Sequence, residues 1–374
     1  MRLIHLSLGD FRNYGSLELP LGQGHHLLLG QNGEGKTNVL EAVHLLGTGG
    51  SQRASRDAVL VAHDAPGYRV GGRFESDRES RSLRVEVTYQ KSGGKKIRID
   101  KEPGRASDLL GAIKVVSFAP SDVELVQESA QVRRRFLDLI GCQLSPKYMT
   151  VLREYQRAIR QRNETLAKSF VYSRGKNGAS LAREPWTDLV IEHGSELFRR
   201  RRHLVDQLSE TLRDLSEDAY KGGGPLDVTY DPAVPWDGDD PRPAFEVALA
   251  DSRDREEAVG YTTCGPHADD VNLKLGGREL RRFGSLGQQQ LSAMFLKLAQ
   301  ADLVRTAVGA SPILLVDEMF AVLDRQAAEE FLARVEGEGQ IILATAQEGW
   351  LGELRDRHFH VHHVRAGAIE SVTT

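Results

Sequence analysis

The stretch that most constrains this chain is Gly30–Thr37, which reads GQNGEGKT. It follows the apolar run His26–Leu29, which suits a buried strand, and precedes Asn38–Leu46, where apolar residues recur at helical spacing. A strand, a glycine-rich turn and a helix in this order are typical of a phosphate-binding loop, whereas an ordinary glycine-rich loop needs neither flank. The sequence therefore predicts that this turn binds the phosphates of a nucleotide.

The residues of the loop have distinct predicted roles. Glycines let the backbone turn its N–H groups toward one point, and the helix behind directs the positive end of its dipole at the same point. Lys36 is expected to reach the outer phosphates, and Thr37 is expected to offer its hydroxyl to Mg²⁺. The predicted nucleotide-binding set in this loop is Gly30, Gln31, Asn32, Gly33, Glu34, Gly35, Lys36 and Thr37.

Length and charge narrow the class of protein. With 374 residues the chain exceeds what one compact core usually holds, so we expect two lobes. Its net charge is -4, so any affinity for DNA must come from local basic patches. Two cysteines, Cys142 and Cys264, are too few for a disulfide framework. No apolar run approaches the ~20 residues that span a bilayer, and Met1–Phe11 lacks a signal-peptide core, so we expect a cytoplasmic protein without a membrane partner.

Alternating apolar and polar residues predict strands on both sides of the phosphate loop. Leu3–Leu8 and Leu17–Leu19 are expected to pair across the polar turn Gly9–Gly15. Arg12 in this turn is either a nucleotide contact or a solvated turn residue, and its spacing alone does not separate the two. Further strands are predicted at Tyr68–Phe74, Leu83–Tyr89, Lys96–Asp100 and Lys114–Phe118, with a hairpin signal at Gly93 and Gly94.

From Gln131 the pattern becomes helical and basic. Gln131–Lys168 holds nine Lys or Arg against three acidic residues, and Tyr148 and Tyr155 are interleaved with them. Such a stripe either tracks a phosphate backbone or forms a solvated helix face, and the charge alone gives the two interpretations equal weight. A second helical stretch is predicted at Trp186–Tyr220, followed by a loop or linker at Gly222–Pro243.

Two polar segments follow residue 243. His267, Asp269 and Asp270 suggest a metal site, but their spacing on one element is unlike that of ligands. A turn that positions the nucleotide or the lobe junction is therefore favoured. Ser285 is predicted to cap the helix Leu291–Val304, and we expect Ser285, Gly287 and Gln288 to form a second helix N-terminus that meets an anion.

The apolar strand Ile313–Val316 ends in two acidic residues, Asp317 and Glu318. After a phosphate loop, such a strand end is typical of phosphoryl-transfer sites, and we favour this interpretation over a solvated terminus. Asp317 is predicted to hold Mg²⁺ together with Thr37, and Glu318 to orient the attacking water. Lys36, Asp317 and Glu318 are thus the predicted catalytic residues.

The order of these motifs suggests how they cooperate. An inserted lobe would carry the Ser285 helix away from its own phosphate loop, but in two copies placed head to tail each would cap the γ-phosphate held by the other. We accordingly expect an ATPase lobe at residues 1–120, an inserted helical lobe at 121–245, and the remainder of the ATPase lobe with the signature segment at 246–374.

The chain resembles the ABC-type, SMC-like ATPases of DNA repair, and among them the RecF family. The resemblance covers nearly the whole chain and is carried by LSLGDFRNY, GQNGEGKTN, VSFAPSD, QVRRRFLD, GPHADD, GSLGQQQ and LLVDE. RRRFLD and GPHADD are specific to RecF. The resemblance implies an α/β fold, namely an ABC-type ATPase head with a P-loop sheet lobe and an antiparallel β subdomain, plus an inserted α-helical lobe.

The resemblance also implies a function. Members of the family bind ATP and DNA, hydrolyse ATP slowly as a switch, and dimerise with ATP between the subunits. They act with RecR and RecO to help load RecA at single-strand gaps or junctions of single-stranded and duplex DNA, in support of replication and the SOS response. The alternatives are an SMC-like ATPase head that serves a nuclease partner, and a scaffold that holds ATP without turnover.

The chain departs from a general ABC head in ways that bear on turnover more than on ATP binding. No glutamine occupies the usual loop after Lys114–Phe118, and Gln127 is the nearest one. No histidine follows the strand Gln340–Ala344, so a γ-phosphate contact there would fall to Thr345 or Gln347. The signature helix has no arginine after its glutamines.

Overall fold

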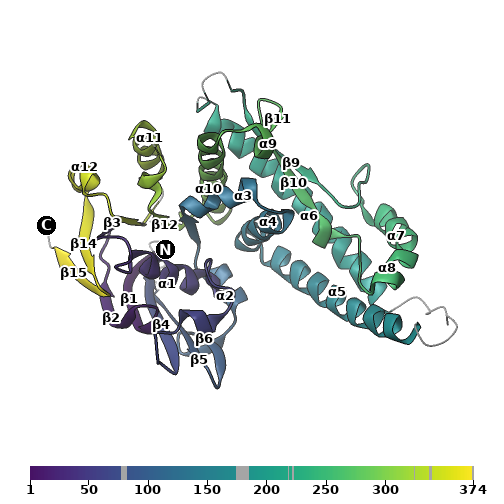
Figure 1. The fold of residues 1–374 in the computed structure, drawn as a ribbon, viewed down its shortest axis with the longest axis horizontal. Helices are drawn as coiled ribbons and strands as arrows, with labels where there is room; N and C mark the ends of the chain where they lie inside the picture. Colours follow the sequence, from purple (N-terminus) through teal and green to yellow (C-terminus); the bar gives the residue numbers. More distant parts are fainter. Residues whose placement is uncertain are drawn as a thin grey trace. The chain divides into compact units, whose positions relative to one another are not determined.

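A computed structural model describes the chain over residues 1–76, 82–173, 185–217, 219–220, 223–323, 325–336 and 339–372 (Figure 1). The chain divides into two units, of which the first comprises Met1–Asp122 and Gln300–Thr374 and the second Val123–Ala299. The first boundary between the units, after Asp122, lies close to the predicted boundary at residue 120. Residues 246–299 differ from the prediction, because they cluster with the helical unit rather than with the ATPase lobe.

One sheet of the first unit is antiparallel and has the order β2-β1-β4-β5-β6-β7. Its strands are β1 (Arg2–Phe11), β2 (Tyr14–Pro20), β4 (Gly67–Glu75), β5 (Ser82–Gln90), β6 (Gly94–Ile99) and β7 (Glu102–Gly104). The alternation that predicted them is retained, since Leu83 and Val85 are buried while Arg84 between them is exposed. The predicted strands are confirmed, and β1 and β2 are longer than expected because only residues 12 and 13 form the turn.

The other sheet of this unit has the order β15-β14-β3-β13-β12-β8, in which only β15 runs antiparallel to its neighbour. Its strands are β3 (His25–Leu29), β8 (Val115–Phe118), β12 (Ile313–Asp317), β13 (Ile341–Thr345), β14 (Phe359–Arg365) and β15 (Ala368–Val372). Helix α1 (Lys36–Thr48) contributes Val39, Val43 and Leu46 to one core with residues of both sheets. The parallel strands read as short continuous apolar runs because both faces of such a sheet are covered.

Short helices complete the first unit. They are η1 (Asp57–Leu60), α2 (Ala106–Ala112), η4 (Met319–Ala321), α11 (Arg325–Val335), η5 (Glu348–Trp350) and α12 (Leu351–Asp356), and η2 (Pro120–Val123) follows β8. Phe331 of α11 meets Phe118 of β8 edge to face, with ring centroids 5.2 Å apart. This contact fixes α11 beside the edge strand of the mainly parallel sheet.

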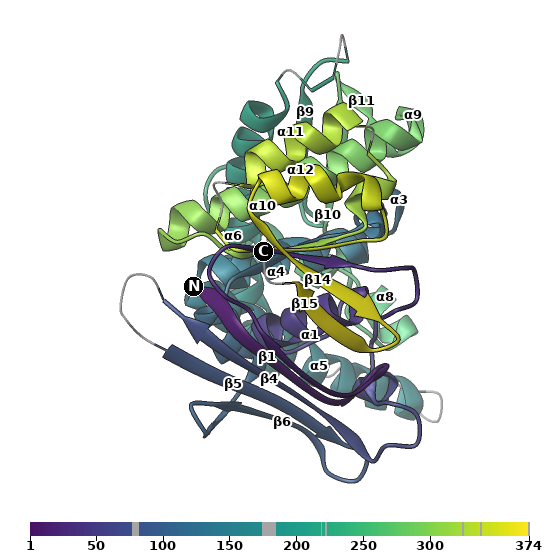
Figure 2. The ribbon, with the colours of Figure 1, turned by 90° about the vertical axis from the view of Figure 1, so that its left-hand side faces the viewer.

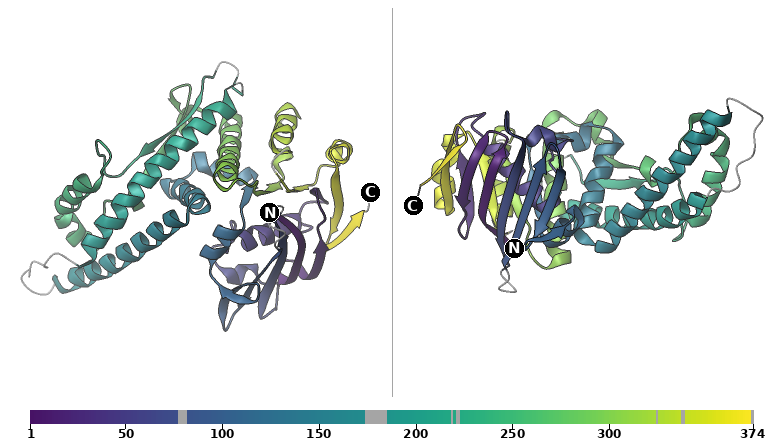
Figure 3. Two further views of the ribbon diagram at one scale, coloured as in Figure 1. Left: turned by 180° about the vertical axis from the view of Figure 1, so that it is seen from behind. Right: turned by 90° about the horizontal axis from the view of Figure 1, so that it is seen from below.

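The second unit is mainly helical and includes two long helices, α5 and α6, that lie alongside each other (Figure 3). Its helices are α3 (Glu124–Gln127), α4 (Ala130–Leu144), α5 (Pro146–Ser173), α6 (Pro185–Ser216), α7 (Arg242–Asp251), α8 (Arg253–Val259), η3 (Pro266–Ala268), α9 (Leu280–Phe283) and the larger part of α10 (Leu286–Val308). A small antiparallel sheet of order β11-β10-β9 accompanies them. Its strands are β9 (Leu226–Asp231), β10 (Asp270–Leu275) and β11 (Arg278–Glu279).

The loop predicted for Gly222–Pro243 is wrong over β9. Leu226 and Val228 alternate with polar residues and are buried, which is the period of a half-buried strand. The glycine, aspartate and proline residues on either side hid this short pattern. Pairing of β9 with β10 is also the reason that residues beyond 245 belong to the second unit. None of the described helices is long and apolar enough to cross a bilayer.

Candidate nucleotide-binding site

The predicted phosphate loop connects β3 to α1, as its flanking sequences indicated (Figure 1). Gly33 and Gly35 adopt φ values of 88° and 114°, which favour glycine over residues with a side chain. Gly35 is the N-cap of α1, no side chain caps this helix, and its first turn holds no acidic residue. The N-terminus of α1 therefore presents backbone N–H groups and a positive dipole end without a capping side chain, which suits a phosphate group.

Lys36 is held back against its own loop. Its side chain is 4% exposed, and its Nζ donates to the carbonyls of Gly30 and Gln31 at 2.8 and 3.0 Å. The same Nζ forms an ion pair with Oε1 of Glu318, and the two atoms lie 3.0 Å apart. Oε1 of Glu318 accepts no hydrogen bond with good geometry. The predicted lysine and the predicted carboxylate thus meet across 282 sequence positions in the folded chain.

Thr37 and Asp317 form the second contact of the site. The Thr37 hydroxyl donates to Oδ1 of Asp317 at 3.0 Å, at the point where β12 ends. Burial raises the pKa of the Asp317 carboxyl, whereas the hydrogen bond from Thr37 acts to lower it. A hydroxyl and a carboxylate at this distance are oxygen donors of the kind that Mg²⁺ takes. Among the described residues, no cluster of three His, Cys, Asp or Glu side chains forms a metal site.

Glu318 is held in an unusual backbone conformation. Its φ of 48° places it in the left-handed region, which costs a residue with a side chain of the order of 1 kcal/mol or more. The backbone N–H of Ala346 donates to its Oε2 at 3.1 Å, and its own N–H donates to the carbonyl of Ala344 at 2.9 Å. These bonds to the end of β13 fix the carboxylate toward Lys36.

The outer side of the loop rests on residues that the prediction did not include. Asn13 donates to the carbonyl of Glu34 at 3.0 Å, and the Tyr14 hydroxyl donates to the carbonyl of Gly35 at 3.2 Å. A Cβ atom on Gly35 would lie 2.6 Å from the Asn13 amide, so this close approach also requires glycine. The sequence offered one signal for these contacts, namely the polar turn between β1 and β2. The side chains of Asn13 and Tyr14 at this turn are suited to hydrogen bonds with backbone groups.

Glu34 has a bracing role in the structure. Its carboxylate accepts a hydrogen bond from the N–H of Ala366, and the N–H of Gly367 donates to its carbonyl at 3.1 Å. Ala366 and Gly367 form the turn between β14 and β15. The side chain of Glu34, one of the predicted nucleotide-binding residues, therefore points to this turn.

Arg12 is engaged by a carboxylate of α1. Its Nε and Nη2 donate to Glu41 at 2.8 and 2.9 Å, and its Nη1 donates to the carbonyl of Val59 at 3.2 Å. Glu41 is almost fully buried, and Ser51 also donates to it. Whether Arg12 touches the nucleotide stays a prediction, and in this structure the guanidinium anchors the turn to α1.

The segment around Ser285 lies in the second unit and forms a capping box at the start of α10. The N–H of Gln288 donates to the Ser285 hydroxyl at 3.3 Å, and the Ser285 N–H donates to Oε1 of Gln288 at 2.9 Å. The predicted cap is confirmed. Phe283 and Leu286, on either side of Ser285, are 66% and 59% exposed.

Gln289 is hydrogen-bonded to the backbone that precedes this segment. Its side-chain amide donates to the carbonyls of Leu280, Arg281 and Gly284, each at 3.2 Å, and it is buried. Gln127 of α3 donates to its Oε1 at 2.7 Å. Gln127, the nearest glutamine to the usual loop position, is thus bound to the signature helix in this structure.

The two residues considered as replacements for the switch histidine also have internal partners. Thr345 is fully buried, and its hydroxyl accepts from the N–H of Gln347 at 3.1 Å. The Gln347 amide donates to the carbonyl of Phe320 at 3.3 Å and accepts from the Trp350 indole at 3.1 Å.

The basic stretch Gln131–Lys168 separates into two groups in the structure. Arg133 and Arg162 are buried and pair with Asp270 and Glu256 at 2.7 Å. Tyr148 and Tyr155, expected to interleave with the basic side chains, are buried and hydrogen-bonded inside the second unit. Arg134 is half-buried. The other Lys and Arg residues of the stretch are exposed, namely Arg135, Lys147, Arg153, Arg157, Arg160 and Lys168.

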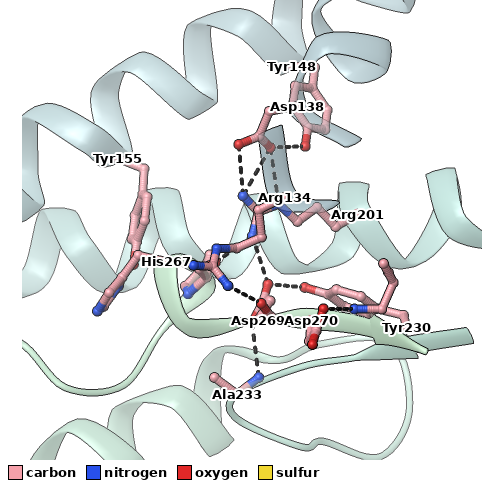
Figure 4. A network of polar contacts seen from close by, with 12 residues as sticks. Arg134, Asp138, Tyr148, Tyr155, Arg201, Tyr230, Ala233, His267, Asp269 and Asp270 are labelled. Carbon is pink, nitrogen blue, oxygen red and sulfur yellow. Dashed lines mark hydrogen bonds and ion pairs between the residues drawn. The ribbon is translucent and has the colours of Figure 1, made fainter. Parts of the chain in front are cut away.

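The predicted turn at His267, Asp269 and Asp270 belongs to a buried polar network (Figure 4). Arg201 of α6, 3% exposed, pairs with Asp138 at 3.0 Å and with Asp269 at 2.9 Å. Tyr148 donates to Asp138 at 2.7 Å, and Tyr230 donates to Asp269. The segment therefore joins α4, α5, α6 and β9 inside one unit.

Comparisons with known proteins agree with these motifs. The sequence profile of the family described as RecF/RecN/SMC N terminal domain matches residues 2–370. The DNA replication and repair protein RecF of Halalkalibacterium halodurans is 32% identical over 375 residues, which cover 99% of this chain and 99% of the relative. The protein of the same name from Streptomyces avermitilis is 35% identical over 352 residues, or 92% of this chain and 93% of the relative.

Two solved structures extend the comparison to the fold. The recombination mediator protein RecF-ATP in the RecFOR pathway matches with a TM-score of 0.88 at 24% identity, over 99% of this chain and 97% of that chain. An SMC head bound to the C-winged helix domain of ScpA matches with a TM-score of 0.52 at 16% identity, over 100% of this chain and 98% of that chain. Both show the shared fold, and the expected ATPase-head architecture is confirmed.

Proposed function

Because the chain belongs to the RecF/RecN/SMC family and is related along its whole length to RecF proteins of DNA replication and repair, we propose that it is an ATP-controlled DNA clamp. In this proposal ATP binds at Gly30–Thr37 and holds two copies together, and the ATP-bound dimer binds DNA at gaps or at junctions of single-stranded and duplex DNA. The dimer acts with RecO and RecR in loading RecA. The observation that carries the proposal is the set of contacts that joins Lys36 to Glu318 and Thr37 to Asp317 beside an uncapped helix N-terminus.

The contacts of Lys36 indicate how binding and hydrolysis would be linked. Lys36 would exchange the Gly30 and Gln31 carbonyls for the outer phosphates, which carry far more negative charge. This exchange separates Lys36 from Glu318, whose carboxylate would then be available to orient the attacking water. Glu318 is thus occupied until the nucleotide is in place.

The oxygen atoms of Thr37 and Asp317 fit a role in holding Mg²⁺, and the bound ion would neutralise charge on the phosphates. The exposed Ser285 and Gly287 of a second copy are proposed to close on the γ-phosphate. Nucleotide-dependent dimerisation then follows from the differential affinity of ATP for the paired state.

The test compares wild type with Lys36→Met and Glu318→Gln in the presence of ATP and Mg²⁺. Dimerisation is followed by light scattering, DNA binding by fluorescence anisotropy and turnover by phosphate release. We expect Lys36→Met to remain monomeric, and Glu318→Gln to accumulate as an ATP-bound dimer on DNA with turnover reduced at least about 100-fold, since it lacks the group that orients water. A wild-type protein that stays monomeric with a non-hydrolysable triphosphate would contradict the clamp.

A further inference from the structure

Strands β1, β4, β5 and β6 of the antiparallel sheet lie side by side (Figure 2), and the face of this sheet that is turned away from the core carries several exposed basic side chains. One face of β4 and β5 packs into the core through residues such as Val70 and Val85, and the opposite face is turned to solvent. The pairing of the strands places five basic residues on this outward face, against Glu18, Glu75 and Glu86. The basic residues are Arg69, Arg73, Arg84, Lys96 and Arg98.

Two of these cations oppose each other without compensation. Arg73 of β4 and Arg84 of β5 are direct cross-strand partners, and both are exposed. Like charges in this position destabilise a strand pair. No carboxylate of the described residues lies within ion-pair distance of either guanidinium. Glu86 pairs with Arg69 at 2.7 Å and lies 3.8 Å from Arg98, Glu18 pairs with His5 at 3.1 Å, and Asp100 accepts a hydrogen bond from the backbone N–H of Arg84 at 2.8 Å.

A hollow of about 280 Å³ lies between these arginines and β1. Its floor includes Gly71, which faces outward and is opposite Ser7 of β1. A Cβ atom on Gly71 would lie 2.5 Å from the Ser7 hydroxyl, so the absence of a side chain at this position keeps the hollow open. Arg69, Arg73 and Arg84 line it together with Glu18 and Glu86.

We propose that this face binds the sugar–phosphate backbone of a nucleic acid, with Arg73 and Arg84 directed at one phosphate above Gly71. The inference rests on the DNA binding proposed above and assigns a surface to it. Arginine forks match phosphate oxygens, and an anion between Arg73 and Arg84 would remove their mutual repulsion. The local excess of cations on a chain of net charge -4 gives the face the character of a backbone contact.

A protein partner fits this face less well. Protein interfaces centre on buried aromatic or aliphatic anchors. The large apolar side chains that are exposed among the described residues all lie outside β1, β4, β5 and β6, namely Val59, Leu189, Val247, Val259, Tyr261, Phe283, Leu286 and Val308. The face offers guanidinium groups, a hydroxyl and a small hollow. These groups suit a bound phosphate better than they suit the apolar side chains of a protein partner.

The test measures binding of the ATP-loaded full-length protein to a gapped DNA duplex over a series of salt concentrations. For Arg73→Ala/Arg84→Ala we expect the slope of log affinity against log salt to fall by about 1, with affinity about tenfold weaker near 0.1 M salt. Arg242→Ala/Arg253→Ala removes the same charge from exposed helical positions in the second unit and should leave the slope unchanged. Gly71→Ala fills the hollow without a change in charge and should weaken binding several-fold.

Thermal unfolding distinguishes binding from a structural role. Because Arg73 and Arg84 repel each other, their replacement should leave the Tm unchanged or raise it. An unaltered salt slope in Arg73→Ala/Arg84→Ala, when wild type binds DNA, would overturn this inference and leave the proposed function standing. Failure of wild type to bind DNA would instead remove the proposed function. Displacement of a labelled polyglutamate that depends on Arg73 and Arg84, with DNA binding unaffected, would assign the face to an acidic protein and also overturn the inference.

Discussion

The predicted phosphate loop and the buried network around Arg201 use the same chemistry in different surroundings. Each brings a cation into contact with a carboxylate that is distant in sequence. Arg201 is 3% exposed and its partner Asp269 is 1% exposed, whereas Glu318, the partner of Lys36, is 23% exposed. The network lies in the core of the second unit, while the loop contacts lie at a helix N-terminus that no side chain caps.

Burial of both partners, rather than the presence of an ion pair, separates the structural contact from the one expected to bind a ligand. A fully buried pair cannot exchange its partner without exposing a charge to the core. Lys36 can exchange its loop carbonyls for phosphates at a smaller cost because its carboxylate partner Glu318 is partly exposed. Buried polar groups that lose a partner should accordingly cost more free energy of unfolding than Lys36 does.

The largest effect is expected for Asp269→Ala. This change leaves the buried guanidinium of Arg201 with one carboxylate partner fewer, and loss of a buried partner typically costs about 3–5 kcal/mol. Urea unfolding followed by circular dichroism measures the change. Asp227→Ala is the matched control, because Asp227 pairs with an Arg213 that is 58% exposed, and a change below about 1 kcal/mol is expected. Equal losses in the two variants would mean that burial does not set the strength of these pairs.

A smaller loss is expected for Gln289→Leu, which would leave three backbone carbonyls at the start of α10 without their donor. Such unsatisfied groups cost about 1–3 kcal/mol in total where water enters the gap. Urea unfolding again measures the change, with Gln326→Leu on the exposed surface of α11 as control. If Gln289 also positions the segment around Ser285, ATP-dependent dimerisation should weaken while ATP affinity of the monomer is kept.

Acid should destabilise the first unit through His26 and His362. Their rings are buried and hydrogen-bonded to each other at 3.0 Å. Burial lowers the pKa of His26 to about 3 and that of His362 to about 4, against about 6.5 in the unfolded chain. The unfolded state therefore binds more protons between these values, and stability falls as the pH decreases below about 6.5, by about 1–2 kcal/mol per histidine at pH 5.

The measurement is urea unfolding at pH 7 and pH 5. His26→Gln should show a smaller loss between the two pH values than wild type. His63→Gln, at a side chain that is 94% exposed, should lose as much as wild type does. Identical pH dependence in all three proteins would exclude the histidine pair as the cause.

The smallest effect on stability without ligand is expected for Lys36→Met, at about 1 kcal/mol or less, because methionine retains the apolar stem and the Glu318 side chain, which is 23% exposed, keeps its hydrogen bond from Ala346. Wild type and Lys36→Met should differ more strongly in stability when nucleotide is present. ATP and Mg²⁺ at about 100 times the dissociation constant should stabilise wild type by about 2.7 kcal/mol and the variant by far less. Unfolding in urea with and without nucleotide gives both quantities, and a loss above about 3 kcal/mol without nucleotide would place Lys36 with the structural network.

Much of the fold was predictable because its signals are local. The glycine loop with its flanking strand and helix, the alternating strands before residue 100 and the apolar strand ending in Asp317 each appear within a few residues of sequence. The cap at Ser285 was predictable for the same reason. The strand β9 was missed because its six residues lie between segments rich in glycine, aspartate and proline.

What could not be predicted depends on pairings between distant residues. The sequence shows nine basic residues in Gln131–Lys168 but does not show that Arg133 and Arg162 would be buried against Asp270 and Glu256. The cation face of the antiparallel sheet was equally hidden, since Arg73 and Arg84 become neighbours only through strand register. The role of Asn13 in bracing the loop likewise requires the fold, because 21 positions separate it from Glu34.

The attachment of Glu34 to the turn at Ala366 and Gly367 has a consequence for biosynthesis. During translation the loop leaves the ribosome long before the hairpin that braces it is made. A nascent chain halted before residue 366 would carry the whole nucleotide-binding motif while lacking its outer support. Competence to capture a triphosphate should therefore arise late, when the hairpin closes over Glu34, and partly synthesised chains would not compete with finished molecules for nucleotide.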